Sequence, residues 1–122
     1  MNAKQEQLLS DHLRLIWNQR DETLRLKAIE SIYAEDVVMY DMEDEVLSGH
    51  TAINQKVTDL LNSLPPGSSI IQSIPSVFQN NAGKLEWGVG TPGSPPILTG
   101  ADIVFFEDDK VKSFYVFVNK EA

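Results

Sequence analysis

The stretch that decides the fold is residues 100–120, GADIVFFEDDKVKSFYVFVNK. Two runs of β-branched and aromatic residues flank the pair Asp108-Asp109, which is typical of a short turn between two strands. Strands joined by so short a connection must pair in the antiparallel direction. The stretch therefore predicts a β-hairpin, with strands over residues 97–107 and 110–120.

A two-residue turn would fix the register of this hairpin. It would place Glu107 opposite Lys110 and, counting back along both strands, Asp102 opposite Tyr115. A slip of one residue would send Tyr115 to the other face of the sheet. We therefore expect Asp102 and Tyr115 to project from one face of the hairpin.

Two more strand-like runs precede the hairpin, over residues 69–79 and 84–91. Residues 80–83 and 92–96 separate them and are rich in Asn, Gly and Pro, which favour turns. Pro75 falls inside the first run and indicates a bend or bulge, because proline cannot donate to a strand ladder. The second half of the chain therefore predicts four sequential antiparallel strands.

The first half of the chain has helical periodicity instead. Leu9, Leu13 and Ile16 recur at three- and four-residue steps within residues 4–18. Asp21 can cap a second helix over residues 21–33, and a third over residues 51–64 ends at a Pro-Pro-Gly sequence. One short strand at residues 37–41 lies between the last two helices, so the whole pattern predicts an α+β fold.

The composition limits the classes of function. With 122 residues the chain is expected to form a single domain over residues 1–122. Its net charge of -8 argues against nucleic acid and anionic membrane surfaces as partners. The sequence has no cysteine, no signal-peptide pattern and no apolar run long enough to span a bilayer. A cytoplasmic location is the expectation.

Asp102 is the most informative polar residue. Apolar side chains lie on both faces of its strand, with Leu98, Val104 and Phe106 on its own face and Ile97, Ile103 and Phe105 on the other. An unpaired carboxylate is costly to bury in such surroundings, so a solitary Asp102 would stay protonated and could donate a hydrogen bond. The structural alternative is that it caps a buried backbone group or pairs with a basic residue.

The order of the elements and two local stretches together resemble the NTF2-like superfamily, in its SnoaL-like and ketosteroid-isomerase-like branch. The first stretch is YAEDVVMYD at residues 33–41 followed by SGHTAI at residues 48–53, and the second runs from Gly100 to Phe117. This resemblance implies a cone-shaped fold with three N-terminal helices packed on a strongly curved antiparallel sheet. It also implies a pocket between helices and sheet, and usually a dimer. Members of the superfamily include isomerases, cyclases, dehydratases, epoxide hydrolases and proteins that only bind.

The resemblance implies roles for two carboxylates. Asp102 falls on the acid with which ketosteroid isomerases hydrogen-bond the developing enolate, and Asp41 falls on their general base. Those isomerases take a second donor, a tyrosine, from the first helix, and residues 13–17 contain none. Tyr40 or Tyr115 could replace it. The expected function is proton transfer beside a carbonyl group of a small apolar molecule, without a cofactor and without a metal.

Other interpretations of these residues stay open. Asp41 begins an acidic stretch, residues 41–45, and could simply start a turn. A metal site in that stretch is conceivable, but the spacing lacks the glycine and distal Glu of a calcium loop. His50 resembles the acid-base histidine of cyclase and dehydratase members, yet its place at a helix start favours a capping role. The epoxide-hydrolase branch is disfavoured because every arginine lies in the first two helices.

The remaining expectations concern the wall of the pocket and the outer face of the sheet. The residues expected to line the pocket are Trp17, Tyr40, His50, Phe78, Trp87, Val104 and Phe117, although aromatic residues are more often plain core. The outward apolar set is expected to be Ile103, Phe105, Phe114, Val116 and Val118, covered by a second subunit in a homodimer. His12 is expected on an exposed helix face, with no role. The competing function is a non-catalytic ligand-binding or dimerisation module.

Overall fold

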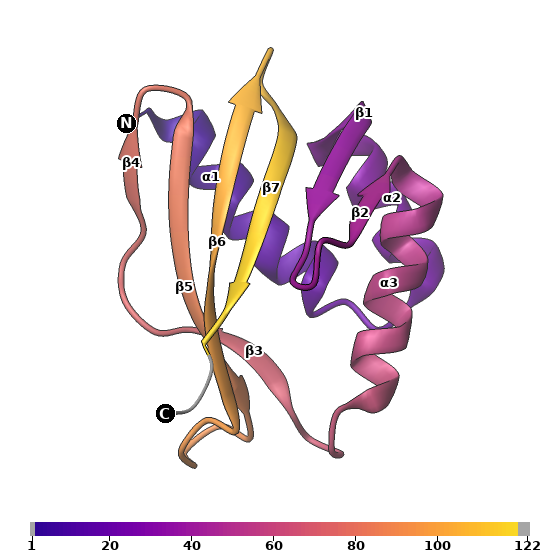
Figure 1. The fold of residues 1–122 in the computed structure, drawn as a ribbon, viewed down its shortest axis with the longest axis vertical. Helices are drawn as coiled ribbons and strands as arrows, with labels where there is room; N and C mark the ends of the chain where they lie inside the picture. The colour runs from indigo at the N-terminus through magenta and orange to yellow at the C-terminus, as the bar shows by residue number, and fades with distance from the viewer. Residues whose placement is uncertain (1, 120–122) are drawn as a thin grey trace.

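A computed structural model describes residues 2–119 of the chain. The helices are α1 (Ala3–Asp11), its π-helical continuation η1 (His12–Trp17), α2 (Glu22–Ile32) and α3 (His50–Ser63) (Figure 1). The side chain of Asp21 accepts hydrogen bonds from the backbone N–H groups of Thr23 and Leu24, as expected of a helix cap. Across the described residues, no helix combines the length and apolar composition needed to cross a bilayer.

Seven strands form one curved, mixed sheet. They are β1 (Tyr33–Tyr40), β2 (Val46–Ser48), β3 (Ser69–Gln72), β4 (Val77–Gln79), β5 (Ala82–Gly90), β6 (Leu98–Glu107) and β7 (Lys110–Val118). Their order is β2-β1-β7-β6-β5-β3, with β4 also paired to β5. The α+β class is confirmed. The expectation of a purely antiparallel sheet is wrong at one place, because β1 and β7 pair in parallel. Parallel pairing requires a long connection between the two strands, and the chain between β1 and β7 is long enough to provide it.

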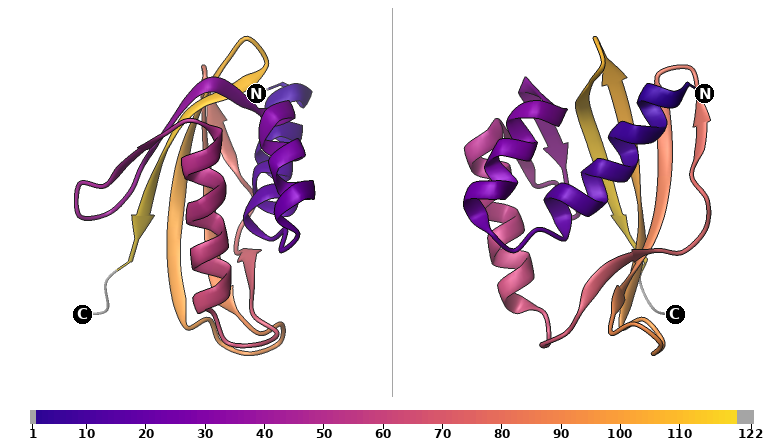
Figure 2. Two further views of the ribbon diagram at one scale, coloured as in Figure 1. Left: turned by 90° about the vertical axis from the view of Figure 1, so that its right-hand side faces the viewer. Right: turned by 180° about the vertical axis from the view of Figure 1, so that it is seen from behind.

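The helices lie on one face of the sheet. Figure 2 shows helix α1 crossing the sheet on the side turned away from the viewer in Figure 1, with α2 and α3 beside it. Side chains from both layers meet there and exclude water; fully buried examples are Ile16, Ile29, Ile53 and Val57 from the helices and Val37, Val104, Val111 and Phe114 from the sheet. This packing gives the sheet an inner face that meets the helices and an outer face that does not.

The run expected as one strand over residues 69–79 is two strands. β3 ends at Gln72 and β4 begins at Val77, with Pro75 in the gap between them. Both strands pair with β5, so the chain leaves the sheet and returns to it. The bend expected at Pro75 is confirmed, whereas the short strand β2 was not expected from the sequence.

The register expected for the β6–β7 hairpin is wrong by one residue. Glu107 pairs with Lys110 as expected, but the ladder shifts between Phe105 and Phe106. Lys112 is the extra residue on β7, and a bulge of this kind moves every later side chain to the other face. Asp102 is therefore opposite Val116, and Tyr115 is opposite Ile103.

The same bulge rearranges the two faces of β7. Phe114 is fully buried in the core rather than outward. Tyr115 and Phe117 lie on the outer face, where they are 38% and 52% exposed. Tyr40 stacks on Tyr115 there, with ring centroids 4.3 Å apart. The outer apolar set is therefore Ile103, Phe105, Tyr115, Phe117 and Tyr40.

Candidate functional site

A small apolar cavity of about 170 Å³ lies between the helices and the inner face of the sheet. Its lining side chains come from η1, α3 and five strands or their ends: Leu13, Trp17, Met39, Asp41, Lys56, Leu60, Ile70, Trp87, Val89, Leu98, Asp102, Val116 and Val118. Only three of these residues carry a charge. A mostly apolar cavity with a few converging polar groups is typical of a small-molecule site.

Asp102 is held on the cavity wall by two N–H donors. The indole Nε1 of Trp87 lies 3.0 Å from one carboxylate oxygen, and Nε2 of His12 lies 2.8 Å from the other. Asp102 is 7% exposed and His12 is fully buried. A carboxyl group in these surroundings keeps its orientation because both of its oxygens are tied to rigid rings.

Behind Asp102, the hydrogen bonding continues through the core. The hydroxyl of Tyr33 lies 2.6 Å from Nδ1 of His12, and the indole Nε1 of Trp17 donates to the same hydroxyl at 3.1 Å. His12 and Trp17 are the first and last residues of η1. The i to i+5 bonding of a π-helix places them about one turn apart, so both face the sheet.

The hydrogen bonds of this network indicate which nitrogen of His12 carries a proton. Tyr33 accepts from Trp17, so its own proton finds an acceptor among the described residues only at Nδ1 of His12. His12 must then carry its proton on Nε2 and donate it to Asp102. A neutral His12 beside an ionised Asp102 satisfies every donor in the network. A proton on Nδ1 of His12 would leave the Tyr33 hydroxyl proton buried without a partner, at a cost of about 1–3 kcal/mol.

The Tyr33 hydroxyl keeps its proton in these surroundings. Burial raises the pKa of Tyr33 well above its ordinary value, and the negative charge of Asp102 raises it further, against the opposing effect of the Trp17 hydrogen bond. Tyr33 therefore stays protonated and remains a donor throughout the neutral and mildly alkaline range.

Asp41 reaches the same cavity from the end of β1. Its carboxylate accepts a hydrogen bond from the backbone N–H of Met42 at 2.7 Å and lies 3.3 Å from the ammonium of Lys56. The pKa of Lys56 is raised, chiefly by its hydrogen bond to Glu45 and also by Asp41, so the ammonium stays charged.

The register places the two carboxylates in one row across the sheet. The β1–β7 ladder ends with the pair Tyr40 and Tyr115, and Asp41 follows Tyr40 directly; on β7, Val116 follows Tyr115 and pairs with Asp102. With neighbouring strands about 4.8 Å apart, this order puts the Cα atoms of Asp41 and Asp102 on the order of 10 Å apart. The side chains of Asp41, Val116 and Asp102 all line the one cavity.

Of the residues expected at the site, four line the cavity: Trp17, Asp41, Trp87 and Asp102. Val104 is fully buried in the core beneath it. Tyr115 and Phe117 lie on the outer face instead, because the bulge in β7 reverses the faces of that strand. Tyr40 of β1 stacks on Tyr115 there. His50 begins α3, and its Nε2 lies 3.0 Å from the carbonyl oxygen of Ala34. This contact ties α3 to β1 and takes His50 away from the cavity.

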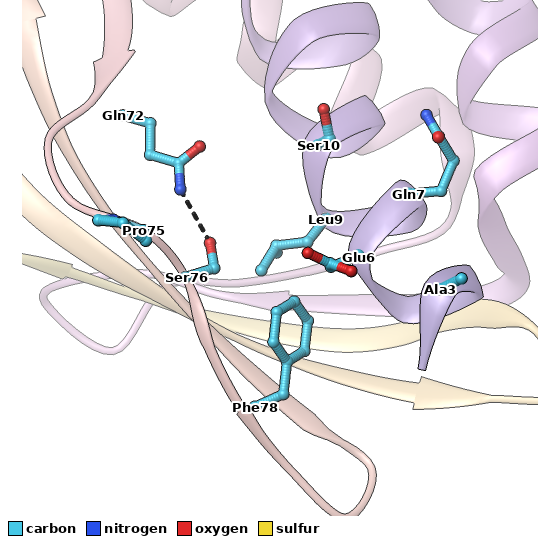
Figure 3. Close-up of a pocket in the computed structure, with 9 residues that line it drawn as sticks. All are labelled: Ala3, Glu6, Gln7, Leu9, Ser10, Gln72, Pro75, Ser76 and Phe78. Atoms are coloured by element: carbon cyan, nitrogen blue, oxygen red, sulfur yellow. Dashed lines mark hydrogen bonds between the residues drawn. The ribbon is translucent and has the colours of Figure 1, made fainter. Parts of the chain in front are cut away.

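Phe78 lines a different hollow, between α1 and the β3–β4 connection (Figure 3). This hollow is larger, about 520 Å³, and its wall includes Glu6, Ser10, Gln72 and Ser76. Two of its polar groups already bond each other, since Gln72 Nε2 lies 3.1 Å from the Ser76 hydroxyl. Phe78 contacts this wall because β4 lies beyond the bend at Pro75.

His12 and Tyr33 are the site residues that sequence reasoning missed. His12 follows Leu8 by four residues and precedes Ile16 by four, so it lies on the same helical stripe as the buried leucines. That spacing was the available signal. Tyr33 is the first residue of β1, directly after α2, and its hydroxyl contacts His12 and Trp17.

Among residues 2–119, no group of three or more His, Cys, Asp or Glu side chains is arranged to hold a metal ion. The acidic stretch at residues 41–45 instead forms a turn, in which the N–H of Asp41 donates to the carbonyl of Glu45 at 2.8 Å. Glu43 and Asp44 have positive φ angles there, consistent with a tight turn.

The fold is found in many solved structures. A SnoaL-like family protein from Agrobacterium tumefaciens, described as a candidate isomerase, superposes with a TM-score of 0.85 at 16% identity, over 98% of this chain and 100% of that one. A candidate ketosteroid isomerase from Kribbella flavida gives a TM-score of 0.74 at 12% identity, over 98% of this chain and 80% of that one. A protein of ketosteroid-isomerase-like fold from Catenulispora acidiphila, in complex with trimethylamine, gives 0.67 at 11% identity, over 90% and 83%.

No protein-family model matches the chain, and no curated protein sequence matches it significantly. At identities of this size the structural likeness shows the fold. The chain has the NTF2-like fold, in the form taken by SnoaL-like and ketosteroid-isomerase-like proteins. The resemblance seen in the sequence is confirmed at that level.

Proposed function

We propose that this chain binds a small, mostly apolar carbonyl compound in the cavity and moves a proton on the carbon beside the carbonyl group, as isomerases and cyclases do. The observation that carries this proposal is the row of Asp41 and Asp102, two carboxylates that face one small apolar cavity. An apolar site strengthens acid-base chemistry because water does not compete for the reacting groups. No cofactor is needed for such a transfer.

In this proposal Asp41 is the base. The C–H bond beside the carbonyl breaks, the proton moves to the Asp41 carboxylate, and the electron pair becomes the enolate. Returning the proton to another carbon completes an isomerisation. Lys56 lines the same cavity 3.3 Å from Asp41, so its ammonium supplies positive charge near the enolate oxygen.

Asp102 takes a different role from the one implied by the sequence resemblance. Donating a hydrogen bond to the enolate would require a proton on Asp102, whereas His12 and Trp87 already present N–H groups to both of its oxygens. We therefore assign Asp102 as an acceptor that holds a polar group of the ligand. His12 is then a positioning residue, because it fixes the carboxylate without lining the cavity.

The structural neighbours support the reaction class. Several are described as candidate isomerases or polyketide cyclases, and another was solved with a small amine bound. These descriptions belong to those proteins. For this chain they make carbon acids the first compounds to test.

Hydrogen–deuterium exchange at carbon tests the proposal directly. With cyclohexanone in D₂O, the protein is expected to speed the loss of the NMR signal of the protons beside the carbonyl. Asp41→Asn is expected to slow that exchange by about 100-fold or more, the usual contribution of a general base. Glu43→Gln in the same acidic turn is the matched control and should exchange at the native rate. Equal rates for the two variants, or no exchange above buffer, would refute the assignment.

A non-catalytic binding module is the second candidate. It is favoured by one observation, that both carboxylates are already held by protein donors: Asp41 by Lys56 and Met42, and Asp102 by His12 and Trp87. Saturable binding of cyclohexanone without exchange of its protons would establish this candidate over the first.

We also propose that the chain forms a homodimer through the outer face of the sheet. The stacked Tyr40 and Tyr115 and the exposed Phe117 form an apolar patch there, of the kind that usually marks an interface. In size-exclusion chromatography with light scattering, the native chain should elute as a dimer and Phe117→Asp as a monomer. Val77→Asp makes the same kind of change, from an apolar residue to aspartate, at an exposed position on β4, and this variant should stay dimeric. A monomeric native chain at micromolar concentration would end this proposal.

A further inference from the structure

Building on the proposed function, we propose that the ligand group held by Asp102 is a positively charged nitrogen. The natural ligand of the cavity is then a compact carbonyl compound that also carries an amine and is about one ring in size. The proposal rests on the hydrogen-bonding capacity of the cavity wall, its charge, its aromatic side chains and its volume.

Asp102 has acceptor capacity to spare. An ionised carboxylate offers about four lone-pair positions, and His12 and Trp87 occupy two of them. Because Asp102 is 7% exposed and lines an apolar cavity, solvent satisfies little of the remainder. A buried charge is stabilised most by a partner of opposite charge that also donates hydrogen bonds.

The donors on the wall are already engaged. The two indole N–H groups that line the cavity point elsewhere, Trp17 to the Tyr33 hydroxyl and Trp87 to Asp102. Lys56 is the cationic donor among the described lining residues, and it contacts Asp41 and Glu45. A ligand that presents donors to this wall therefore finds acceptors at Asp102, whereas one that presents only acceptors must rely on Lys56.

The charge of the cavity also favours a cationic ligand. Two carboxylates, Asp41 and Asp102, and one ammonium, Lys56, line it, so one negative charge is in excess (−2 + 1 = −1). The ammonium of Lys56 also contacts Glu45, with 2.6 Å between their atoms. A cation entering the cavity is attracted, and an anion is repelled, over the short distances that a low dielectric allows.

The aromatic walls suit an alkylammonium group. Trp17 and Trp87 both line the cavity, and the face of an indole ring attracts cations. The hydrogen bonds of their N–H groups hold both rings in place, so the site is formed before the ligand arrives.

The volume sets the size of the ligand. An apolar cavity of about 150 Å³ holds one benzene molecule. The cavity here, at about 170 Å³, therefore encloses one six-membered ring with a single substituent and no fused second ring. In such a ligand, an amine on Asp102 would leave the opposite end of the ring beside Asp41 and Lys56.

Three ring compounds of one size test the inference on the native chain: cyclohexylamine, cyclohexanol and cyclohexanecarboxylate at pH 7. Fluorescence reports binding specifically, because the two tryptophans of the chain both line the cavity. We expect cyclohexylamine to bind at least 10-fold more tightly than cyclohexanol, and cyclohexanecarboxylate to bind most weakly. Tighter or equal binding of cyclohexanol or of the carboxylate would overturn the inference.

Two variants test whether Asp102 causes the preference for the amine. Asp102→Asn should remove the preference for the amine over cyclohexanol, while Asp36→Asn, an exposed carboxylate on β1, should keep it. A preference that survives Asp102→Asn would also overturn the inference. The result is separable from the proposed reaction, which is measured as proton exchange on a neutral ketone and depends on Asp41.

Discussion

Replacing Tyr33 with phenylalanine tests the buried network most directly. The substitution removes one oxygen atom and keeps the ring, which packs against Phe114 with centroids 5.4 Å apart. It leaves Nδ1 of His12 and the indole N–H of Trp17 without partners, where His12 is fully buried and Trp17 is 7% exposed. The space vacated by one hydroxyl oxygen is too small to admit a replacing water molecule readily.

The expected loss of stability follows from the two orphaned groups. Each buried polar group left unpaired costs about 1–3 kcal/mol, so we expect Tyr33→Phe to lower the free energy of unfolding by about 2–6 kcal/mol. That is a large share of the 5–15 kcal/mol or so that stabilises a typical domain. Tyr115→Phe is the control, because Tyr115 is half-exposed on the outer face, and it should change stability by less than about 0.5 kcal/mol.

Urea unfolding followed by circular dichroism measures both variants, and a single cooperative transition is expected for a chain that folds as one domain. The reasoning fails if Tyr33→Phe is no less stable than Tyr115→Phe. Nitrogen NMR of the native protein supplies a second check on the direction of the hydrogen bonds. His12 should carry its proton on Nε2, and a proton on Nδ1 would contradict the assigned network.

Three further outcomes follow from the same contacts. The folded state holds the Tyr33 proton at pH values where the unfolded chain has released it, so Tyr33 should not change the stability with pH below pH 10 and should lower it as the pH rises above 10. In thermal melts, the melting temperature of Tyr33→Phe should fall less over that alkaline range. Gly100→Ala should cost about 1–3 kcal/mol or more in urea unfolding, since its Cβ would clash with the backbone carbonyl oxygen of Phe117 and lie 2.5 Å from an indole carbon of Trp87. Gly90→Ala, with ordinary contacts of 3.4 Å or more, should cost less than about 1 kcal/mol. Arg25→Met should cost about 2–4 kcal/mol because it strips the buried carbonyls and amide oxygen that Arg25 contacts, and the exposed Arg14→Met should stay within about 0.5 kcal/mol of the native chain.

The bulge in β7 shows where sequence reasoning lost part of the site. The regular hairpin count put Tyr115 beside Asp102, and one extra residue, Lys112, reversed that. Residues 114–118 are all apolar, so no alternation in the sequence marks which of them face the core and which face outward.

The sequence by itself determined the features that depend on neighbouring residues. Helical periodicity, the cap at Asp21, the stop at Pro65 and the alternation along the strands are local, so the three helices, the long hairpin and the apolar setting of Asp102 could be derived from them.

Only the tertiary structure decided which polar groups meet. Asp102 and His12 are 90 residues apart, and nothing local to either one indicates that the π-helical turn of η1 brings His12 against β6. The same holds for the parallel pairing of β1 with β7, which places Asp41 in the row of Asp102. The setting of Asp102 depends on these long-range contacts, because a carboxyl group that looks isolated along its strand has both oxygens held once two buried N–H groups reach it.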